Sequence, residues 1–220
     1  LEGKDTISLD KGIFIDKSRR LHPKLRQFIS ENFYDERLKN FDFTEKRKII
    51  FSNKKDSLPE TGIVMIDANH KEVCRQKSEE EGTLVKDFYN RLLGSTFLDE
   101  NDNKKIMNEE DILVVAPYNV QVNYLKSILP KGAKVGTIDK FQGQQAPATI
   151  ISMTTSDPES LPRNVDFFFS RNRLNVAISR SQCLSIVIMN KKILEIACKK
   201  IKHIHLVNTF MKLLEFEKKI

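Results

Sequence analysis

Short apolar runs alternate along the chain with stretches in which apolar residues recur at helical spacing. The runs are nearly continuous and are bounded by polar or turn-forming residues, which is typical of strands buried on both faces. The predicted strands cover residues 62–67, 111–116, 134–138, 148–153 and 184–189.

Amphipathic stretches between these runs predict helices. Ser78 is followed three residues later by Glu81, which is the signature of a capping box at a helix start. A second helix is predicted over residues 120–129, and a third begins at Ser170 and runs through Ile178. Strands that alternate with such helices indicate βαβ units. The chain is therefore predicted to be an α/β protein, with a mostly parallel sheet and helices on both faces.

No internal repeat and no domain boundary is visible in the 220 residues. Polar stretches with Pro, Asn and Asp predict loops at residues 52–61, 99–110 and 156–165. In an open parallel sheet, ligands usually bind beyond the carboxyl ends of the strands. We therefore expect the residues that carry chemistry to gather at that edge.

Composition narrows the class of protein. Hydrophobic residues make up 40% and charged residues 30% of the chain, which excludes a disordered or low-complexity protein. No apolar run is long enough to span a membrane, and no secretory signal is visible. The chain does not begin with Met, which indicates a processed chain or an excised fragment. Its three cysteines form no C-x-x-C pair, so we expect no zinc site and a reducing, cytoplasmic compartment.

The net charge of +7 is unevenly distributed. Residues 191–220 contain eight lysines and only three glutamates. A solvated helix face explains this excess as well as an acidic partner or a nucleic acid does.

Two arginines stand just before a predicted helix that a proline starts. Arg19 and Arg20 precede His22 and Pro23. The guanidinium group presents a fixed fork of donors that suits phosphate or carboxylate, although paired basic residues are more often simply solvated. We expect His22 to make a structural hydrogen bond.

A second candidate segment covers residues 135–145. A predicted strand leads through Thr137 to a glycine between glutamines, Gln142-Gly143-Gln144-Gln145. Such a turn can present N–H groups to a phosphate, and an ordinary strand-to-loop transition fits the same spacing.

A third segment, residues 171–181, places three arginines along one short helix. Arg173 and Arg180 are two turns apart and are predicted to lie on nearly the same face. An arginine held rigidly at a helix end can stabilise charge on a transferring phosphoryl group. A basic surface helix is the alternative.

Several signatures of known chemistry are absent. The sequence has no G-x-x-x-x-G-K-[ST] phosphate loop and no Asp-Glu pair after an apolar strand, so no site for magnesium is predicted. No H-E-x-x-H or G-x-S-x-G motif is present. The chain has arginines suited to a triphosphate and nothing to hold its phosphates and metal.

Together these segments resemble the second RecA-like domain of superfamily I helicases, in the branch that includes the nonsense-mediated-decay RNA helicase. The resemblance extends from about residue 12 to residue 216, and within the branch it is closest to bacterial proteins that join a RecB-like nuclease to such a helicase. Four segments carry it in order: Arg20-Leu21-His22-Pro23, Ala116-Pro117-Tyr118 with Gln121, residues 135–145, and residues 173–180.

The resemblance implies a role for each matching residue. Arg180 would be the principal arginine finger on the γ-phosphate of ATP, and Arg20 would reach the same phosphate. Nucleotide contacts would come from Arg19, which could stack on the adenine, and from Gln142, Gly143 and Gln145 near the phosphates and ribose. Contacts to a nucleic-acid backbone would come from Pro117, Tyr118 and Thr137 near the opposite face.

The resemblance also implies a single RecA-like domain over residues 1–220, with a basic helical tail at 191–220 packed on it. The chain would be half a motor, inactive alone, because the first RecA-like domain would hold ATP and Mg²⁺. Single-stranded nucleic acid, DNA rather than RNA, would be the partner, with a RecB-like nuclease domain in the same protein. Gln145 departs from the family pattern, which has Glu there, and this removes a carboxylate contact to the nucleotide.

Other readings of the residues remain open. A nucleic-acid- or partner-binding module without an ATPase role fits Gln145 and the missing phosphate loop. A nuclease is less well supported, because Asp16, Asp67 and Asp87 form no spaced metal cluster. A nucleotide-metabolising α/β fold would require a Gly-rich phosphate loop.

Overall fold

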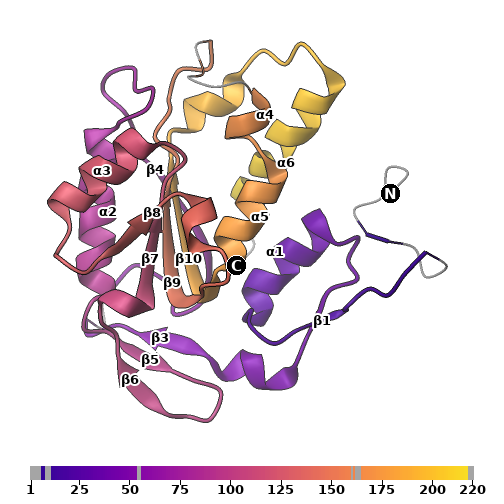
Figure 1. Cartoon of the computed structure of the whole chain (residues 1–220), viewed down its shortest axis with the longest axis vertical. Helices are drawn as coiled ribbons and strands as arrows, with labels where there is room; N and C mark the ends of the chain where they lie inside the picture. The colour runs from indigo at the N-terminus through magenta and orange to yellow at the C-terminus, as the bar shows by residue number, and fades with distance from the viewer. Residues whose placement is uncertain (1–5, 8–10, 54–55, 160, 162–164, 218–220) are drawn as a thin grey trace.

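The computed structural model describes residues 6–7, 11–53, 56–159, 161 and 165–217. A five-stranded sheet with the strand order β4-β10-β9-β7-β8 forms its centre, and every pair of neighbouring strands is parallel (Figure 1). The strands are β4 (Gly62–Asp67), β7 (Ile112–Val115), β8 (Lys134–Gly136), β9 (Ala146–Ser152) and β10 (Ser181–Met189). The α/β fold with a mostly parallel sheet, of the RecA-like kind, is confirmed.

Alternate residues of the strands feed two separate apolar cores. In β7, Leu113 and Val115 belong to one core, and Ile112 and Val114 belong to the other. The first core is covered by α1 (Pro23–Phe33), α5 (Arg171–Ser179) and α6 (Ile201–Glu217), and the second by α2 (Glu79–Leu92) and α3 (Asn119–Ile128). Helices therefore cover both faces of the sheet, as predicted, and explain why its strands read as continuous apolar runs.

The predicted helix starts are confirmed by their caps. The Ser78 hydroxyl accepts a hydrogen bond from the Glu81 amide at 3.1 Å, and the Ser170 hydroxyl accepts one from the Arg173 amide at 3.3 Å. His22 has the structural role expected of it, because its Nδ1 accepts from the Lys24 amide at 3.2 Å and caps α1. Pro23 follows as the first helical residue, where its missing N–H costs nothing.

The Glu81 side chain does not complete a capping box. It is fully buried and crosses to the end of β9, where its carboxylate accepts hydrogen bonds from the Thr154 amide at 2.8 Å and from the Ser152 hydroxyl at 2.5 Å. His70 Nε2 lies 3.3 Å from the same carboxylate. Glu81 thus fixes the carboxyl end of β9, where Thr154 has a φ of 75°.

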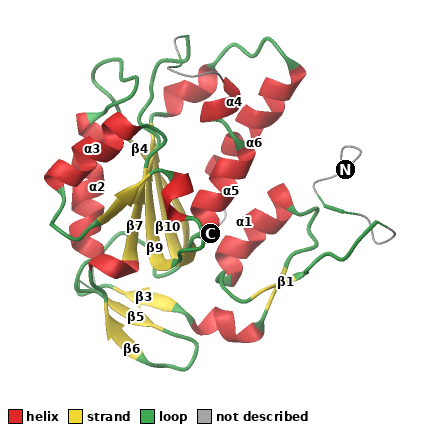
Figure 2. Cartoon of the chain, in the orientation of Figure 1, coloured by secondary structure: helices red, strands yellow, loops and turns green. Residues whose placement is uncertain are grey.

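A second, antiparallel sheet was not predicted. It consists of β3 (Lys48–Ile50), β5 (Thr96–Leu98) and β6 (Lys104–Ile106), and Figure 2 shows it below the main sheet. The predicted loop at residues 99–110 is wrong in part, because β6 and the 3₁₀ turn η2 (Glu109–Asp111) lie within it. All residues of β6 are exposed, so this strand has no apolar alternation for the sequence to display.

The remaining elements are short, apart from the C-terminal helix. A parallel bridge joins β1 (Lys17–Ser18) to β2 (Lys39–Asn40). The other short elements are η1 (Asp42–Lys46), η3 (Ile138–Phe141), α4 (Val165–Phe168) and η4 (Lys191–Glu195). The basic C-terminal segment is helical over η4 and α6, and α6 packs its apolar residues, Phe210 and Leu213 among them, into the first core. Part of the predicted loop 156–165 and the residues after 217 lie outside the described residues.

Candidate functional site

The candidate residues lie at two opposite ends of the main sheet. Arg180 immediately precedes β10 and Gln145 immediately precedes β9, so both lie at the amino edge. Pro117 and Thr137 follow β7 and β8 and lie at the carboxyl edge. The expectation that all of them gather at the carboxyl edge is therefore wrong. Because α5 runs antiparallel to the strands it connects, its last turn returns to the amino edge (Figure 1).

Arg20, Gln145 and Arg180 form a connected group at the amino edge, here called the arginine cluster. The Arg20 guanidinium donates from Nε to Gln145 Oε1 at 2.8 Å and from Nη1 to the Ser179 carbonyl at 3.1 Å. Arg180 donates from Nη1 to the Gln144 carbonyl at 3.3 Å. The fold therefore brings Arg20 to partners that are 125 and 159 positions away in the sequence, whereas Arg180 and Gln144 are 36 positions apart.

No carboxylate neutralises this cluster within the described part of the chain. Burial lowers the pKa of Arg20, and the nearby positive charge of Arg180 lowers it further. Burial alone lowers the pKa of Arg180, and its Nε is buried without a hydrogen-bond partner among the described residues. The two guanidinium groups thus repel each other in a partly desolvated site, an arrangement that an anion would relieve.

Lysines add to the positive potential beside the cluster. A hollow that begins at Gln144 and Gln145 is also lined by Lys126, Lys131, Lys134 and Lys140. Lys134 lies 4.0 Å from the exposed Glu110, a weak ion pair. Much of the amino edge therefore attracts anions.

Arg47 supports the cluster and was missed by the sequence analysis. Its side chain is buried and donates from Nη1 to the carbonyls of Arg19 and Arg20, at 3.1 and 2.6 Å. Its Nε pairs with Glu100 at 2.8 Å, which lowers the pKa of Glu100. Arg47 follows η1, with no motif around it, so only the folded structure reveals that it holds the backbone that presents Arg20.

The residues around the cluster that are predicted to contact the nucleotide differ in whether they already contact another part of the chain. Arg19 is exposed, and its guanidinium already stacks on the Phe41 ring at 4.9 Å. Gln142 and Gly143 form an exposed turn after η3. Gly143 has a φ of +80°, and a Cβ placed there would meet nothing within 4 Å. Glycine is therefore favoured there by conformation, and the space beside it is open.

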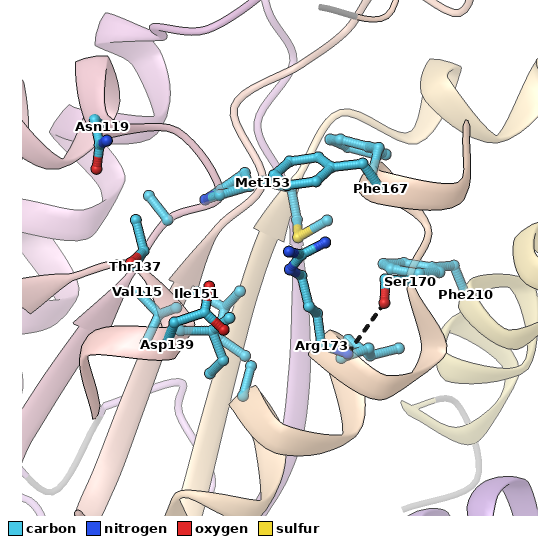
Figure 3. A pocket seen from close by; sticks show the side chains of 16 residues that line it. Val115, Asn119, Thr137, Asp139, Ile151, Met153, Phe167, Ser170, Arg173 and Phe210 are labelled. Atoms are coloured by element: carbon cyan, nitrogen blue, oxygen red, sulfur yellow. Dashed lines mark hydrogen bonds between the residues drawn. The ribbon is translucent and has the colours of Figure 1, made fainter. Parts of the chain in front are cut away.

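The carboxyl edge contains a cavity of about 220 Å³. Pro117 and Thr137 line it, as do Arg173 and Phe167, and Figure 3 shows Thr137 and Asp139 on one side with Phe167 and Arg173 on the other. Tyr118 is buried, and its ring centroid lies 5.9 Å from that of Phe167. Of the three residues predicted to contact nucleic acid, two line the cavity and Tyr118 packs behind it.

Arg173 and Arg180 lie at opposite ends of the same helix and therefore at opposite edges of the sheet. The helix α5 begins at the cavity and ends at the arginine cluster, and seven residues span about 10 Å of helix. The helix therefore presents one arginine to each edge of the sheet. Arg173 and Phe167 are residues that the sequence analysis did not assign to the nucleic-acid side, although the resemblance included Arg173.

No three His, Cys, Asp or Glu side chains in the described part of the chain gather closely enough to hold a metal ion. None of the described helices is both long and apolar enough to cross a membrane.

Comparison with known proteins gives matches over most of the chain. The chain is 31% identical over 177 residues to an uncharacterised ATP-dependent helicase of Caenorhabditis elegans, a match that covers 77% of this chain and 11% of that protein. It is 26% identical over 194 residues to the DNA polymerase alpha-associated DNA helicase A of Saccharomyces cerevisiae, covering 83% of this chain and 28% of that protein.

The ATP-dependent helicase upf1 of Schizosaccharomyces pombe is 29% identical over 192 residues, covering 80% of this chain and 19% of that protein. The chain thus spans less than a third of the length of each of these relatives. A family model described as an AAA domain matches residues 6–192. With this match over most of its length and with its RecA-like sheet, the chain belongs to that AAA domain family of helicase-like proteins.

Proposed function

We propose that this chain is the second RecA-like domain of an ATP-dependent superfamily I helicase. It supplies arginine fingers and nucleic-acid contacts to a separate domain that holds the phosphates of ATP and the Mg²⁺. The domain acts on single-stranded nucleic acid, DNA rather than RNA, in the cytoplasm. The whole chain forms one domain, with the 191–220 tail packed on it, and a RecB-like nuclease is a further domain of the same protein.

The observation that carries this proposal is the uncompensated charge of the arginine cluster. Arg20 and Arg180 are held by a side-chain amide and main-chain carbonyls, which orient their guanidinium groups without neutralising them. When the two domains close, Arg180 neutralises charge that develops on the transferring phosphoryl group, and Arg20 stabilises the same oxygens. An arginine finger contributes a factor of roughly 10³–10⁵ in rate.

The presence of Gln145, where the family pattern has Glu, fits the proposal that Arg20 keeps its charge for the phosphates. Its amide oxygen accepts from Arg20 Nε and leaves the guanidinium charge intact. A glutamate at the same place would form an ion pair with Arg20 at this distance. Gln145 thus makes the amino edge more positive than the family pattern would, at the cost of a carboxylate contact to the nucleotide.

Mg²⁺ would be held by the partner domain and would supply positive charge to the phosphates of ATP. This chain's own residues have a different task, which is to present the guanidinium groups of Arg20 and Arg180 to the same phosphates. Because the phosphate-binding part lies elsewhere, the chain alone is expected to hydrolyse no ATP.

The carboxyl edge is proposed to contact the backbone of the strand. Thr137 and Pro117 stand there at the cavity rim, and Arg173 adds positive charge. Contacts of this kind are independent of sequence and weaken steeply as salt rises, because bound phosphates release counterions.

The test is ATP turnover by the 220-residue chain, with and without single-stranded DNA, and by the longer protein that joins it to a phosphate-binding domain. We expect no turnover by the chain alone and DNA-stimulated turnover by the longer protein. Arg180→Ala should abolish that turnover and leave nucleotide binding intact, whereas Lys199→Ala, which also removes one charge, should change neither. If the chain alone hydrolyses ATP and Arg180→Ala removes that activity, the proposal that a separate domain holds the phosphates is wrong.

A nucleic-acid- or partner-binding module without an ATPase role is the second candidate, and the absence of a G-x-x-x-x-G-K-[ST] phosphate loop from the sequence is the observation that favours it. The two candidates differ in one measurement. A module of this kind would bind single strands equally well with and without a nucleotide, and Arg180→Ala would leave every activity of the longer protein unchanged.

A further inference from the structure

We propose that the small antiparallel sheet of β3, β5 and β6 sets the position of Arg20 during ATP turnover, with Arg47 and Glu100 as its positioning residues. This inference rests on the proposed function, which assigns Arg20 to the γ-phosphate, and deepens it. Neither positioning residue touches the phosphates, because both act through the main chain that carries Arg20. The small sheet therefore affects the rate of turnover without contacting the nucleotide.

The pairing of β3 with β5 places Arg47 beside Glu100. In this antiparallel pair Ile49 faces Phe97, and both are buried in the second core, which anchors the small sheet to the main one. Arg47 directly precedes β3, so the same register leads from it to the start of the turn between β5 and β6. There Glu100 Oε2 accepts a hydrogen bond from Arg47 Nε at 2.8 Å.

The turn that presents Glu100 is braced by Asp99. Asp99 Oδ1 accepts from the amides of Asn101 and Asn103 at 2.8 and 2.9 Å, and Oδ2 accepts from the Asn103 side chain at 3.0 Å. Side chains of Asp that bond to the main chain a few residues on stabilise such turns. Glu100 is therefore held at a defined place at the tip of the hairpin.

Arg47 supplies the long-range support of the segment that carries Arg20. The amides of Arg20 and Leu21 donate to the Ser18 hydroxyl at 3.3 and 3.2 Å, which are local contacts. The carbonyls of Arg19 and Arg20 instead accept from Arg47 Nη1, which belongs to a residue 28 and 27 positions away. The position of this segment relative to the rest of the domain thus depends on Arg47.

The place of Arg47 requires the fork of a guanidinium group. Its Nε and Nη1 point in fixed directions, one to the Glu100 carboxylate and the other to two carbonyls. A lysine would keep the charge but has a single nitrogen at the end of a flexible stem. Only 6% of the Arg47 side chain is exposed, so Glu100 also balances a largely buried charge. Arg47 fixes the main chain of Arg20, while Gln145 and the Ser179 carbonyl fix its guanidinium group.

The first experiment measures steady-state ATP turnover by the longer protein with saturating single-stranded DNA. Arg47→Lys should lower kcat by roughly 10- to 100-fold and leave KM for ATP within about threefold, because a displacement of about 1 Å at a catalytic group is costly. Glu100→Ala should lower kcat by about two- to fivefold, since a partly exposed ion pair is weak. Glu100→Gln, which keeps an oxygen for Arg47 Nε, should recover most of that loss. Melting curves show whether each variant folds.

Lys46 provides the matched control. It stands next to Arg47, and its Nζ pairs with Asp102 of the same turn at 3.1 Å. Lys46→Ala removes this neighbouring ion pair and should leave kcat and KM unchanged. The double variant Arg20→Ala/Arg47→Lys should be slower than Arg20→Ala by at most about twofold, because no side chain remains to be positioned.

The second experiment needs only the 220-residue chain. The Nε–H group of Arg20 donates to Gln145, and in an isotope-labelled chain it gives a magnetic resonance signal that Arg20→Ala removes. Arg47→Lys should shift or broaden this signal, because the Arg20 main chain moves. Lys46→Ala should leave the signal in place.

The outcomes separate this inference from the proposed function. If the longer protein hydrolyses no ATP, or if Arg20→Ala leaves turnover unchanged, the proposed role of Arg20 fails, and the Arg20 signal of the chain alone decides whether Arg47 positions it. If Arg20→Ala slows turnover and Arg47→Lys does not, or if the two losses multiply in the double variant, the positioning role is overturned. An Arg20 signal that Arg47→Lys leaves unchanged overturns it as well.

Discussion

The two edges of the sheet are built on opposite physical principles. At the amino edge, Arg20 and Arg180 are partly exposed and are positioned by hydrogen bonds that they donate to residues distant in the sequence. At the carboxyl edge, a cavity is lined both by apolar side chains and by polar ones, which are Asn119, Thr137, Asp139, Ser170 and Arg173. In the proposed motor domain, the first arrangement would recognise the charge of a triphosphate, and the second would combine shape with polar contacts to a strand.

The largest expected effect comes from a substitution that disrupts the amino edge and leaves the carboxyl edge intact. In the longer protein, Arg180→Ala should lower ATP turnover by roughly 10³-fold or more, because the proposed finger would act on the transition state. Binding of single strands without nucleotide should stay within about twofold. Arg180→Lys retains the charge but not the fork, and it should recover only a small part of the rate. Steady-state turnover and strand anisotropy on the same preparations check both edges, and a strand-binding defect as large as the rate defect would show that the edges are not separate.

Glu81 supports the carboxyl edge in the same way that Arg47 supports the amino edge. Removing its buried carboxylate leaves the Thr154 amide and the Ser152 hydroxyl without their acceptor, and we expect Glu81→Ala to cost about 3 kcal/mol of unfolding free energy. Glu79→Ala, at an exposed position of the same helix, should cost at most about 0.5 kcal/mol. Urea denaturation measures both, and equal costs for the two variants would refute the anchoring role.

The folded chain should lose stability in acid because of His22, which begins α1 beside the arginine cluster. Burial lowers the pKa of this histidine to about 4, with smaller contributions from the charges of Lys24 and Arg47, while a backbone hydrogen bond with Glu45 opposes the shift. Above its ordinary value of 6.5 the imidazole is neutral in both states, and the stability is fully present. As the pH falls from 6.5 towards 4, the unfolded chain takes up a proton that the folded chain excludes, so stability is lost, by at most about 3 kcal/mol.

The control for His22 is a cap that does not titrate. Asn is a good N-cap residue, so His22→Asn should retain the helix start and flatten the stability profile between pH 6.5 and 4. Denaturation midpoints at a series of pH values provide the comparison. If the variant loses as much stability as the wild type over this range, other groups control the acid sensitivity.

The smallest effect expected concerns Gln145. Replacing it with Glu should place a carboxylate beside Arg20 and weaken triphosphate binding by the longer protein by about two- to fivefold, since exposed ion pairs are worth at most about 1 kcal/mol. The difference should shrink as salt rises. Tighter binding by Gln145→Glu would mean that the carboxylate contact typical of the family outweighs the lost charge.

The sequence revealed the parts of the molecule that repeat a local pattern. The central strands and the caps at Ser78 and Ser170 were predictable, because buried strands and helix starts carry their signals within a few residues. The members of the arginine cluster were singled out from local residue patterns and received their roles from the resemblance, but their place at the amino edge was not foreseen. That placement depends on the direction in which α5 crosses the sheet.

What the sequence could not show depends on contacts between distant segments. Arg47 acts on the carbonyls of Arg19 and Arg20, and its own surroundings contain no motif. The strand β6 is wholly exposed and pairs only because the hairpin brings it beside β5. The stacking of Arg173 on Phe167 crosses the break between α4 and α5. In each case the partner is chosen by the fold.

The helix α5 connects the two edges of the sheet. It packs Leu174, Ala177 and Ile178 into the first core, so a shift of the helix would disturb that packing. Its first turn lines the cavity, and its last residue precedes Arg180. In the proposed motor, a tilt of α5 on closure of the two domains would move both edges together, because the helix reaches from one edge to the other. The movement at each edge would depend on the angle of that tilt and on the distance from its pivot.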